Sequence, residues 1–362
     1  MIAFYKNNIK NRCPILSRVF ISLVLVLPVC ATSANAATKA SDFTVSMTGL
    51  YLQPSASNLG YAVYTTPLPA PAPNWYQQTV KPNYTDSFDL GLQYALADKS
   101  NQVDLDWLHF KSNDSARYAV TEPNTSVGPS YYFGPAEQFL LNTAASSYVK
   151  FNVDQINLVL GHVIKLGNSV TIKPVVGLGS ALLKEGITNN YSGADPVYGP
   201  YTHSVYVNSK FTGIGPRLGL DGAFFVTHHF GVDAAMDGSV LLGRLSTNTN
   251  FNSWTGYTGG VLPHNNTPTN TTLSSQAQTK MVPEVETKLG LFYNVVRNSG
   301  SVFSIHTGYM FSDYVNSISQ VLPSSLVPGT WEAGTVAIIS QAQTTSDLSL
   351  NGPYLKLAWQ FA

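Results

Sequence analysis

Runs in which apolar residues alternate with small or polar residues recur along the chain. In the clearest run, the apolar members are Phe88, Leu90, Leu92, Tyr94 and Leu96, and the intervening members are Asp89, Gly91, Gln93 and Ala95. Alternation with a period of two predicts a β-strand with one apolar face. A second such run, from Val103 to Trp107, follows the turn-forming segment 97–101, so the two runs together predict a β-hairpin.

The same hairpin unit recurs three more times, and single strands begin and end the series. The further predicted strands are 42–53, 148–164, 169–183, 210–226, 229–243, 279–293, 301–314 and 346–361. Short turns join the two strands of each hairpin, whereas long segments rich in Asn, Ser, Thr, Pro, Gly and Tyr separate the hairpins. These long segments are 54–86, 112–147, 184–209, 245–278 and 315–345.

About ten strands with alternating short and long connections are typical of an all-β, transmembrane, up-and-down antiparallel β-barrel. In such barrels the short turns face the periplasm and the long loops face the outside of the cell. An even strand number then places both chain ends on the periplasmic side. A soluble β-sandwich is the alternative fold, and it explains the alternation but not the regular change between short and long connections.

The N-terminal region has the features of a secretory signal peptide. Basic residues precede an apolar run at 19–29, and the Ala-Asn-Ala sequence at 34–36 fits the small-x-small pattern of a cleavage site. The apolar run is shorter than the roughly 20 residues that a membrane-spanning helix needs. We therefore expect residues 1–36 to be a cleaved signal peptide and residues 37–362 to form a single barrel domain.

Composition supports export and membrane insertion through strands. Hydrophobic residues make up 44% of the chain and charged residues only 11%, against about 25% in an ordinary soluble domain. Both cysteines, Cys13 and Cys30, fall within the predicted signal peptide, so the mature chain has no thiol for metal binding or catalysis. The formal net charge of zero argues against a nucleic-acid partner.

The C-terminal strand resembles the assembly signal of outer-membrane proteins. Its residues Leu355, Leu357, Trp359 and Phe361 share one face that suits lipid, although Ala362 follows the last aromatic residue. A backbone that crosses lipid must pair all its polar groups, so this strand is expected to pair with the first strand and close the barrel.

Charged residues occupy the opposite, lumen-facing side of the predicted strands. The expected lumen-lining residues are Asp89, Asp104, Asp106, Lys173, Arg217, Asp221, Asp233, Asp237, Glu284, Glu286, Lys288 and Lys356. One interpretation is a charged aqueous passage that favours some ions over others. The other is a structural network of ion pairs that fills the lumen. A barrel of about ten strands is close to the narrow limit, so a wide general porin is not expected.

Four segments resemble the Legionella major outer membrane protein family of pore-forming barrels. The most specific is 211–221, which reads Phe-Thr-Gly-Ile-Gly-Pro-Arg-Leu-Gly-Leu-Asp, and the others are 107–110, 173–178 and 282–290. The likeness extends from about Ser41 to Phe361. The resemblance implies an outer-membrane location in a Gram-negative bacterium, pore formation and exposure at the cell surface, and it supplies no catalytic residues.

We therefore expect a narrow, porin-like channel rather than an enzyme, without cofactor or metal. The alternative is a surface adhesin or structural barrel with a plugged lumen, since the long segments carry many aromatic residues that can bind a partner. Expected partners are outer-membrane lipid and lipopolysaccharide, the periplasmic chaperones and barrel-assembly machinery, and, in the adhesin alternative, a host-surface protein.

Overall fold

The computed structural model describes residues 43–65, 75–98, 100–121, 125, 127–129, 142–195, 199–255, 269–297, 301–327 and 337–361. The predicted signal peptide and its cleavage site lie outside these ranges. Within them, no helix is long and apolar enough to span a membrane.

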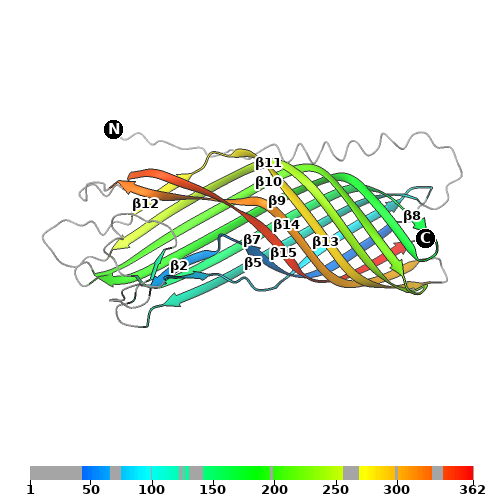
Figure 1. Cartoon of the computed structure of the whole chain (residues 1–362), viewed down its shortest axis with the longest axis horizontal. Coiled ribbons are helices and arrows are strands. Elements are labelled where there is room, and N and C mark those ends of the chain that lie inside the picture. The colour runs from blue at the N-terminus through cyan, green and yellow to red at the C-terminus, as the bar shows by residue number, and fades with distance from the viewer. Residues whose placement is uncertain are drawn as a thin grey trace, which may run out of the picture. The chain divides into compact units, whose positions relative to one another are not determined.

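Ten antiparallel strands form a closed ring (Figure 1). In chain order they are β1 (Phe43–Ala56), β4 (Thr85–Ala95), β5 (Asn101–Ala119), β7 (Asn142–His162), β9 (Val170–Asp195), β10 (Gly199–Phe225), β11 (Phe230–Thr255), β13 (Gln278–Val296), β14 (Val302–Val327) and β15 (Ala337–Phe361). Neighbours in this order pair with each other, and β1 pairs with β15 from Phe43↔Phe361 to Ala56↔Leu348. The predicted up-and-down barrel and its closure by the two terminal strands are therefore confirmed.

Five short strands accompany the ring. They are β2 (Gly60–Thr65), β3 (Trp75–Thr79), β6 (Val127–Pro129), β8 (Ile164–Leu166) and β12 (Thr269–Ser274). The first three form a small separate sheet, whereas β8 pairs with β9 and β12 pairs with β11. The turn after β8 uses Gly167 with a φ of 71°, a left-handed conformation that favours glycine.

The strands continue far beyond the lengths that the sequence predicted. Segment 184–209 was expected to be a loop, yet β9 and β10 extend through it and pair as far as Gly199↔Asp195. Side chains still alternate there, but with the opposite polarity: Val205 and Val207 are buried, whereas Asn208 faces outward. Polar residues outside and apolar residues inside are the pattern of a barrel wall in water, so these strands project beyond the membrane.

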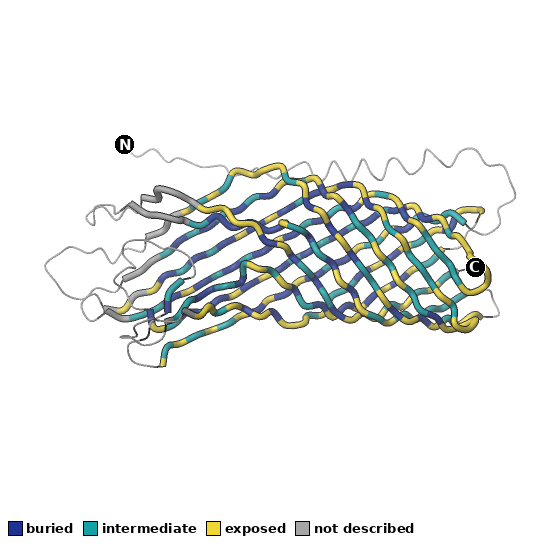
Figure 2. Tube along the Cα trace, in the orientation of Figure 1, coloured by how far each residue is buried: buried dark blue, intermediate teal, exposed yellow. Residues whose placement is uncertain are grey.

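An apolar band surrounds the other part of the barrel. On β9 the outward residues from Ile172 to Leu182 are mostly apolar, a length close to the roughly 9–11 residues that a tilted strand needs to cross a bilayer. Buried and exposed positions alternate along these strands in Figure 2. Next to the short turns, Trp359 stacks on Phe361 with ring centroids 5.9 Å apart, and Phe361 stacks on Phe43. Aromatic residues at this height suit the membrane interface.

Candidate functional site in the barrel lumen

A charged cavity of about 500 Å³ fills the lumen at the height of the apolar band. All twelve predicted lumen-lining residues point inward, and all except Glu284 line this cavity. The lining extends to Thr44, Gln93 and Gln360, close to the short turns, so the cavity lies at the periplasmic end of the barrel. Of the charged residues that line it, seven are acidic and four are basic.

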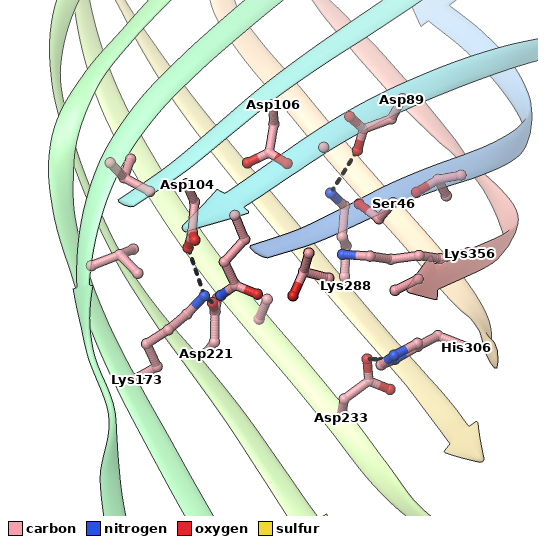
Figure 3. Close-up of a pocket in the computed structure, with 18 of the residues that line it drawn as sticks. Ser46, Asp89, Asp104, Asp106, Lys173, Asp221, Asp233, Lys288, His306 and Lys356 are labelled. Carbon is pink, nitrogen blue, oxygen red and sulfur yellow. Dashed lines mark hydrogen bonds and ion pairs between the residues drawn. The ribbon is translucent and has the colours of Figure 1, made fainter. Parts of the chain in front are cut away.

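Two or more carboxylates share each of three basic side chains, which are Lys173, Lys288 and Arg217. The Lys173 ammonium lies 2.8 Å from Asp104 and 2.9 Å from Asp221. Lys288 lies 2.9 Å from Glu286 and 3.7 Å from Asp89 (Figure 3). Sharing one cation between two carboxylates leaves a net negative charge in each group. The pairs Lys173–Asp104 and Lys288–Asp89 join strands that are not neighbours in the ring, so they contribute to the shape of the lumen as well as to its charge.

Two charged side chains face the cavity without such a partner. Asp106 and Lys356 both point into the space seen in Figure 3. Among the described residues, neither forms an ion pair or a side-chain hydrogen bond. They are therefore available to a solute or ion that enters the cavity.

A layer of polar side chains closes the end of the cavity that is farther from the short turns. Arg217 donates hydrogen bonds of 2.9 and 3.1 Å to the two carboxylate oxygens of Glu284. Gln155 on β7 donates to Glu284 on β13 at 2.6 Å, and Tyr314 on β14 donates to the Gln155 side-chain oxygen. Since β7 and β14 lie opposite each other in the ring of ten, this layer crosses the whole lumen.

Small residues make room for this layer. A Cβ atom at Gly179 on β9 would lie 3.7 Å from the Arg217 side chain and 3.0 Å from Asn157. Gly179 therefore leaves space beside Asn157 in which the long Arg217 side chain can lie across the wall.

Beyond the polar layer, towards the long connections, the lumen is mainly apolar, with a smaller number of buried polar side chains. Buried side chains from several strands meet there, including Phe110, Phe151, Leu183, Phe211 and Leu241. This part of the lumen belongs to the strand extensions beyond the apolar band, so its apolar interior is in effect the hydrophobic core of the projecting half of the barrel.

Residues 57–64, here called the lumen segment, fold into the extracellular mouth of the barrel. Leu59, Tyr61 and Ala62 are buried among the apolar wall residues. At the start of the segment, Ser57 directly follows β1 and its hydroxyl contacts Ser346 on β15. The next residue, Asn58, donates hydrogen bonds of 3.0 and 2.8 Å to the Glu185 carboxylate on β9. Because β9 and β15 lie opposite each other in the ring, the lumen segment spans the lumen.

Glu185 is the buried acidic group that holds this segment. It lies beyond the apolar band of β9, and the residue is only 2% exposed. Burial raises the pKa of Glu185 to about 8, against an ordinary value of 4.5, and the hydrogen bonds from Asn58 oppose this rise. Near neutral pH the carboxyl is therefore mostly protonated while the lumen segment is docked.

Similarity to known proteins settles the family. The model of the Legionella pneumophila major outer membrane protein precursor matches residues 35–361. The chain belongs to this family. Its location in the bacterial outer membrane, predicted from the sequence, is thereby confirmed.

Solved structures give only weak likenesses, and no curated protein sequence matches. The outer membrane protease OmpT of Escherichia coli is 9% identical with a TM-score of 0.40, covering 89% of this chain and 98% of the protease. The toluene transporter TodX of Pseudomonas putida is 10% identical with a TM-score of 0.30, covering 90% of each chain. These values are too low to indicate a shared activity.

Several residues that shape the lumen of this outer membrane protein were not among the predicted lumen-lining residues. Gln155 and Tyr314 were omitted because only charged residues were considered, although alternation places Gln155 inward. His306, which pairs with Asp233 at 3.0 Å, could have been found by the same alternation. The lumen segment carries no such signal, since it was assigned to a long external loop at 54–86. Leu355, Leu357, Trp359 and Phe361 lie on the outward face, as predicted, and their role in assembly stays a prediction.

Proposed function

We propose that this protein is a narrow, gated channel for small solutes, and that the structure represents its closed state. The charged cavity of about 500 Å³ carries this proposal, because a lumen that served only to pack the barrel would have no reason to keep Asp106 and Lys356 facing open space. Charged groups that line a passage bias which ions enter it. The excess of acidic over basic residues favours cations.

The closed part of the lumen has features that support opening. The lumen segment is not a strand of the ring, so it can leave the lumen without breaking a pair of the barrel wall. The buried hydroxyls of Ser112, Ser147 and Ser317 have no hydrogen-bond partner among the described residues. Since buried polar groups are nearly always paired with protein or water, these hydroxyls suit a passage that admits water. Apolar constrictions of this kind gate other channels by excluding water.

Crosslinking of the lumen segment to the wall tests the proposal. The predicted mature chain has no cysteine, so the double variant Asn58→Cys/Glu185→Cys introduces the only thiols, and a short bifunctional thiol reagent then joins the lumen segment to β9. In planar bilayers we expect discrete conductance steps from the uncrosslinked variant and their loss after crosslinking. The unaltered protein treated with the same reagent is the control.

A variant in which a short Gly-Ser linker replaces residues 58–64 gives the opposite test. We expect it to be open for a larger fraction of time than the unaltered protein. If this variant folds, as shown by a heat-dependent gel shift, and still gives no conductance steps, the channel proposal is wrong. The alternative of a plugged, structural or adhesive barrel then stands.

A further inference from the structure

Five basic residues lie on the outward face of five consecutive strands. They are Lys111 on β5, Lys150 on β7, Lys184 on β9, Lys210 on β10 and Arg244 on β11, and we call them the basic row. All five are exposed. The strands pair through Lys111↔Asn152, Asn152↔Lys184 and Lys184↔Lys210, so three of the cations lie in one line across the sheet.

The other two cations lie close to this line. Lys150 is two residues along β7 from Asn152, and Arg244 pairs with Thr212, which is two residues along β10 from Lys210. Neighbouring strands lie about 4.8 Å apart, so the cations of adjacent strands can contact a single anionic group.

The basic row lies at the edge of the membrane. Leu182, two residues before Lys184, ends the apolar band of β9, and Leu242 directly precedes Arg244 on the outward face of β11. The residues beyond the row, towards the end of the barrel that carries the long connections, are polar. The row therefore lies where lipid head groups of the outer leaflet meet the barrel, and its long side chains can reach them while their stems cover apolar surface.

These cations have no acidic partner in the protein. Among the described residues, no carboxylate forms an ion pair with any of the five, and Lys150 contacts only the Tyr148 ring, 4.9 Å from its centroid. Two acids lie near the row on the same face: Asp154 is engaged by His109 at 2.7 Å, and Asp86 on the neighbouring strand β4 forms no ion pair with Lys111. Uncompensated positive charge in a line is costly unless an external anion neutralises it.

The opposite side of the barrel has the reverse charge at this height. The outward acidic residues there are Asp313 on β14 and Asp347 on β15, and Asp86 on β4 lies at the border of the two sides, because β4 is the neighbour of β5. The charge around the rim is therefore divided into a basic and an acidic side. A general attraction to the membrane surface would not require the cations to be gathered on one side, whereas a site for one anionic lipid would.

We propose that the basic row is a binding site for the phosphate groups of lipopolysaccharide, with the acyl chains of its lipid A part packed on the apolar band below. Charge complementarity selects a phosphorylated head group, and the apolar residues next to Lys184 and Arg244 select a lipid over free phosphate. The site rests on the outer-membrane location of the protein and does not depend on channel activity.

Binding of purified protein to lipid A in detergent tests this site. The probes are diphosphorylated lipid A, the same lipid A after removal of its phosphates, and inorganic phosphate as competitor. We expect the triple variant Lys150→Gln/Lys184→Gln/Lys210→Gln to bind diphosphorylated lipid A about 100-fold more weakly, at about fivefold for each cation near a membrane surface. The matched Lys→Arg triple variant keeps the charge and should bind nearly as tightly as the unaltered protein.

Three results would overturn the proposal. They are unchanged binding by the Gln triple variant, equal binding of the dephosphorylated lipid by the unaltered protein, and complete displacement by inorganic phosphate at the concentration of the lipid. A heat-dependent gel shift reports folding of each variant. If the triple variant does not fold, the double variant Lys184→Gln/Lys210→Gln is measured instead, and it should lose about 25-fold.

Discussion

Ionisation of Glu185 should open the channel as pH rises. Burial raises its pKa to about 8 while the lumen segment is docked, and release of the segment would expose the carboxyl to water and return the pKa towards 4.5. The docked state therefore binds the proton more tightly than the released state. The resulting contribution to docking is fully present below about pH 4.5 and is lost as pH rises towards about 8.

The size of this effect follows from the change in pKa. A rise of the pKa from 4.5 to about 8 corresponds to at most about 5 kcal/mol of proton-linked docking energy, because each pKa unit corresponds to about 1.4 kcal/mol. Glu185 stays on the inner wall of the barrel after release, so its pKa returns only part of the way, and we expect about 1–2 kcal/mol, a factor of about 5–30 in the ratio of open to closed channels. His203 adds little to this response, because burial lowers its pKa to about 4 and keeps it neutral over this range.

Single-channel recordings in planar bilayers between about pH 5 and about pH 9 measure this ratio. We expect the open fraction of the unaltered protein to increase with pH. The Glu185→Gln variant keeps a neutral side chain of similar shape next to Asn58, so it should stay closed at every pH. Asp347→Asn, which removes an exposed acid from the outer face, serves as the matched control and should respond like the unaltered protein. An unchanged pH response in Glu185→Gln, or a fall in opening with rising pH, would refute the reasoning.

Four further predictions concern stability, assembly and selectivity. Arg217→Ala leaves the buried Glu284 without its cation and should destabilise the protein by about 3–5 kcal/mol in urea unfolding, and adding Glu284→Gln should recover part of this loss. Leu218→Arg places a charge in the middle of the apolar band, where the residue is 63% exposed, and should cost about 2–4 kcal/mol in the same measurement, whereas Leu218→Ile should be nearly neutral. Asp106→Asn should lower the ratio of cation to anion permeability, measured as a reversal potential across a salt gradient; an unchanged potential would exclude Asp106 from the ion path. Phe361→Ala should lower the fraction of outer-membrane protein that shows a heat-dependent gel shift, and an equal fraction in variant and unaltered protein would argue against a role in assembly.

The parts of the structure that follow strict alternation could be predicted from the sequence. Once a strand is recognised, its period of two fixes which side chains face the lumen, and this is why Lys173, Arg217 and Glu286 were placed inward. The closing pair of β1 and β15 followed from the need to satisfy every backbone group in lipid.

The extracellular half could not be predicted in the same way. Segment 184–209 was expected to be a loop because Asn, Ser, Gly and Tyr are frequent in it, and because the strand pattern was sought with apolar residues outward. Beyond the membrane the apolar residues face the lumen and the polar residues face outward, so a search for strands with an apolar outer face does not find this part of them. The contact between Asn58 and Glu185 joins residues 127 positions apart, and it depends on the finished ring rather than on any local pattern.

The pairing of β9 with β10 up to Gly199↔Asp195 also limits how the amino-acid sequence of the projecting half of the barrel can vary. In a free loop, an insertion or an exchange of residues disturbs little else. Here each position in 184–195 is held by hydrogen bonds on a wall whose inner face is packed, so a single inserted residue would turn every following side chain to the wrong side. Sequence change in this region is therefore restricted to the outward side chains, and an antibody against it would recognise the shape of a sheet rather than a linear peptide.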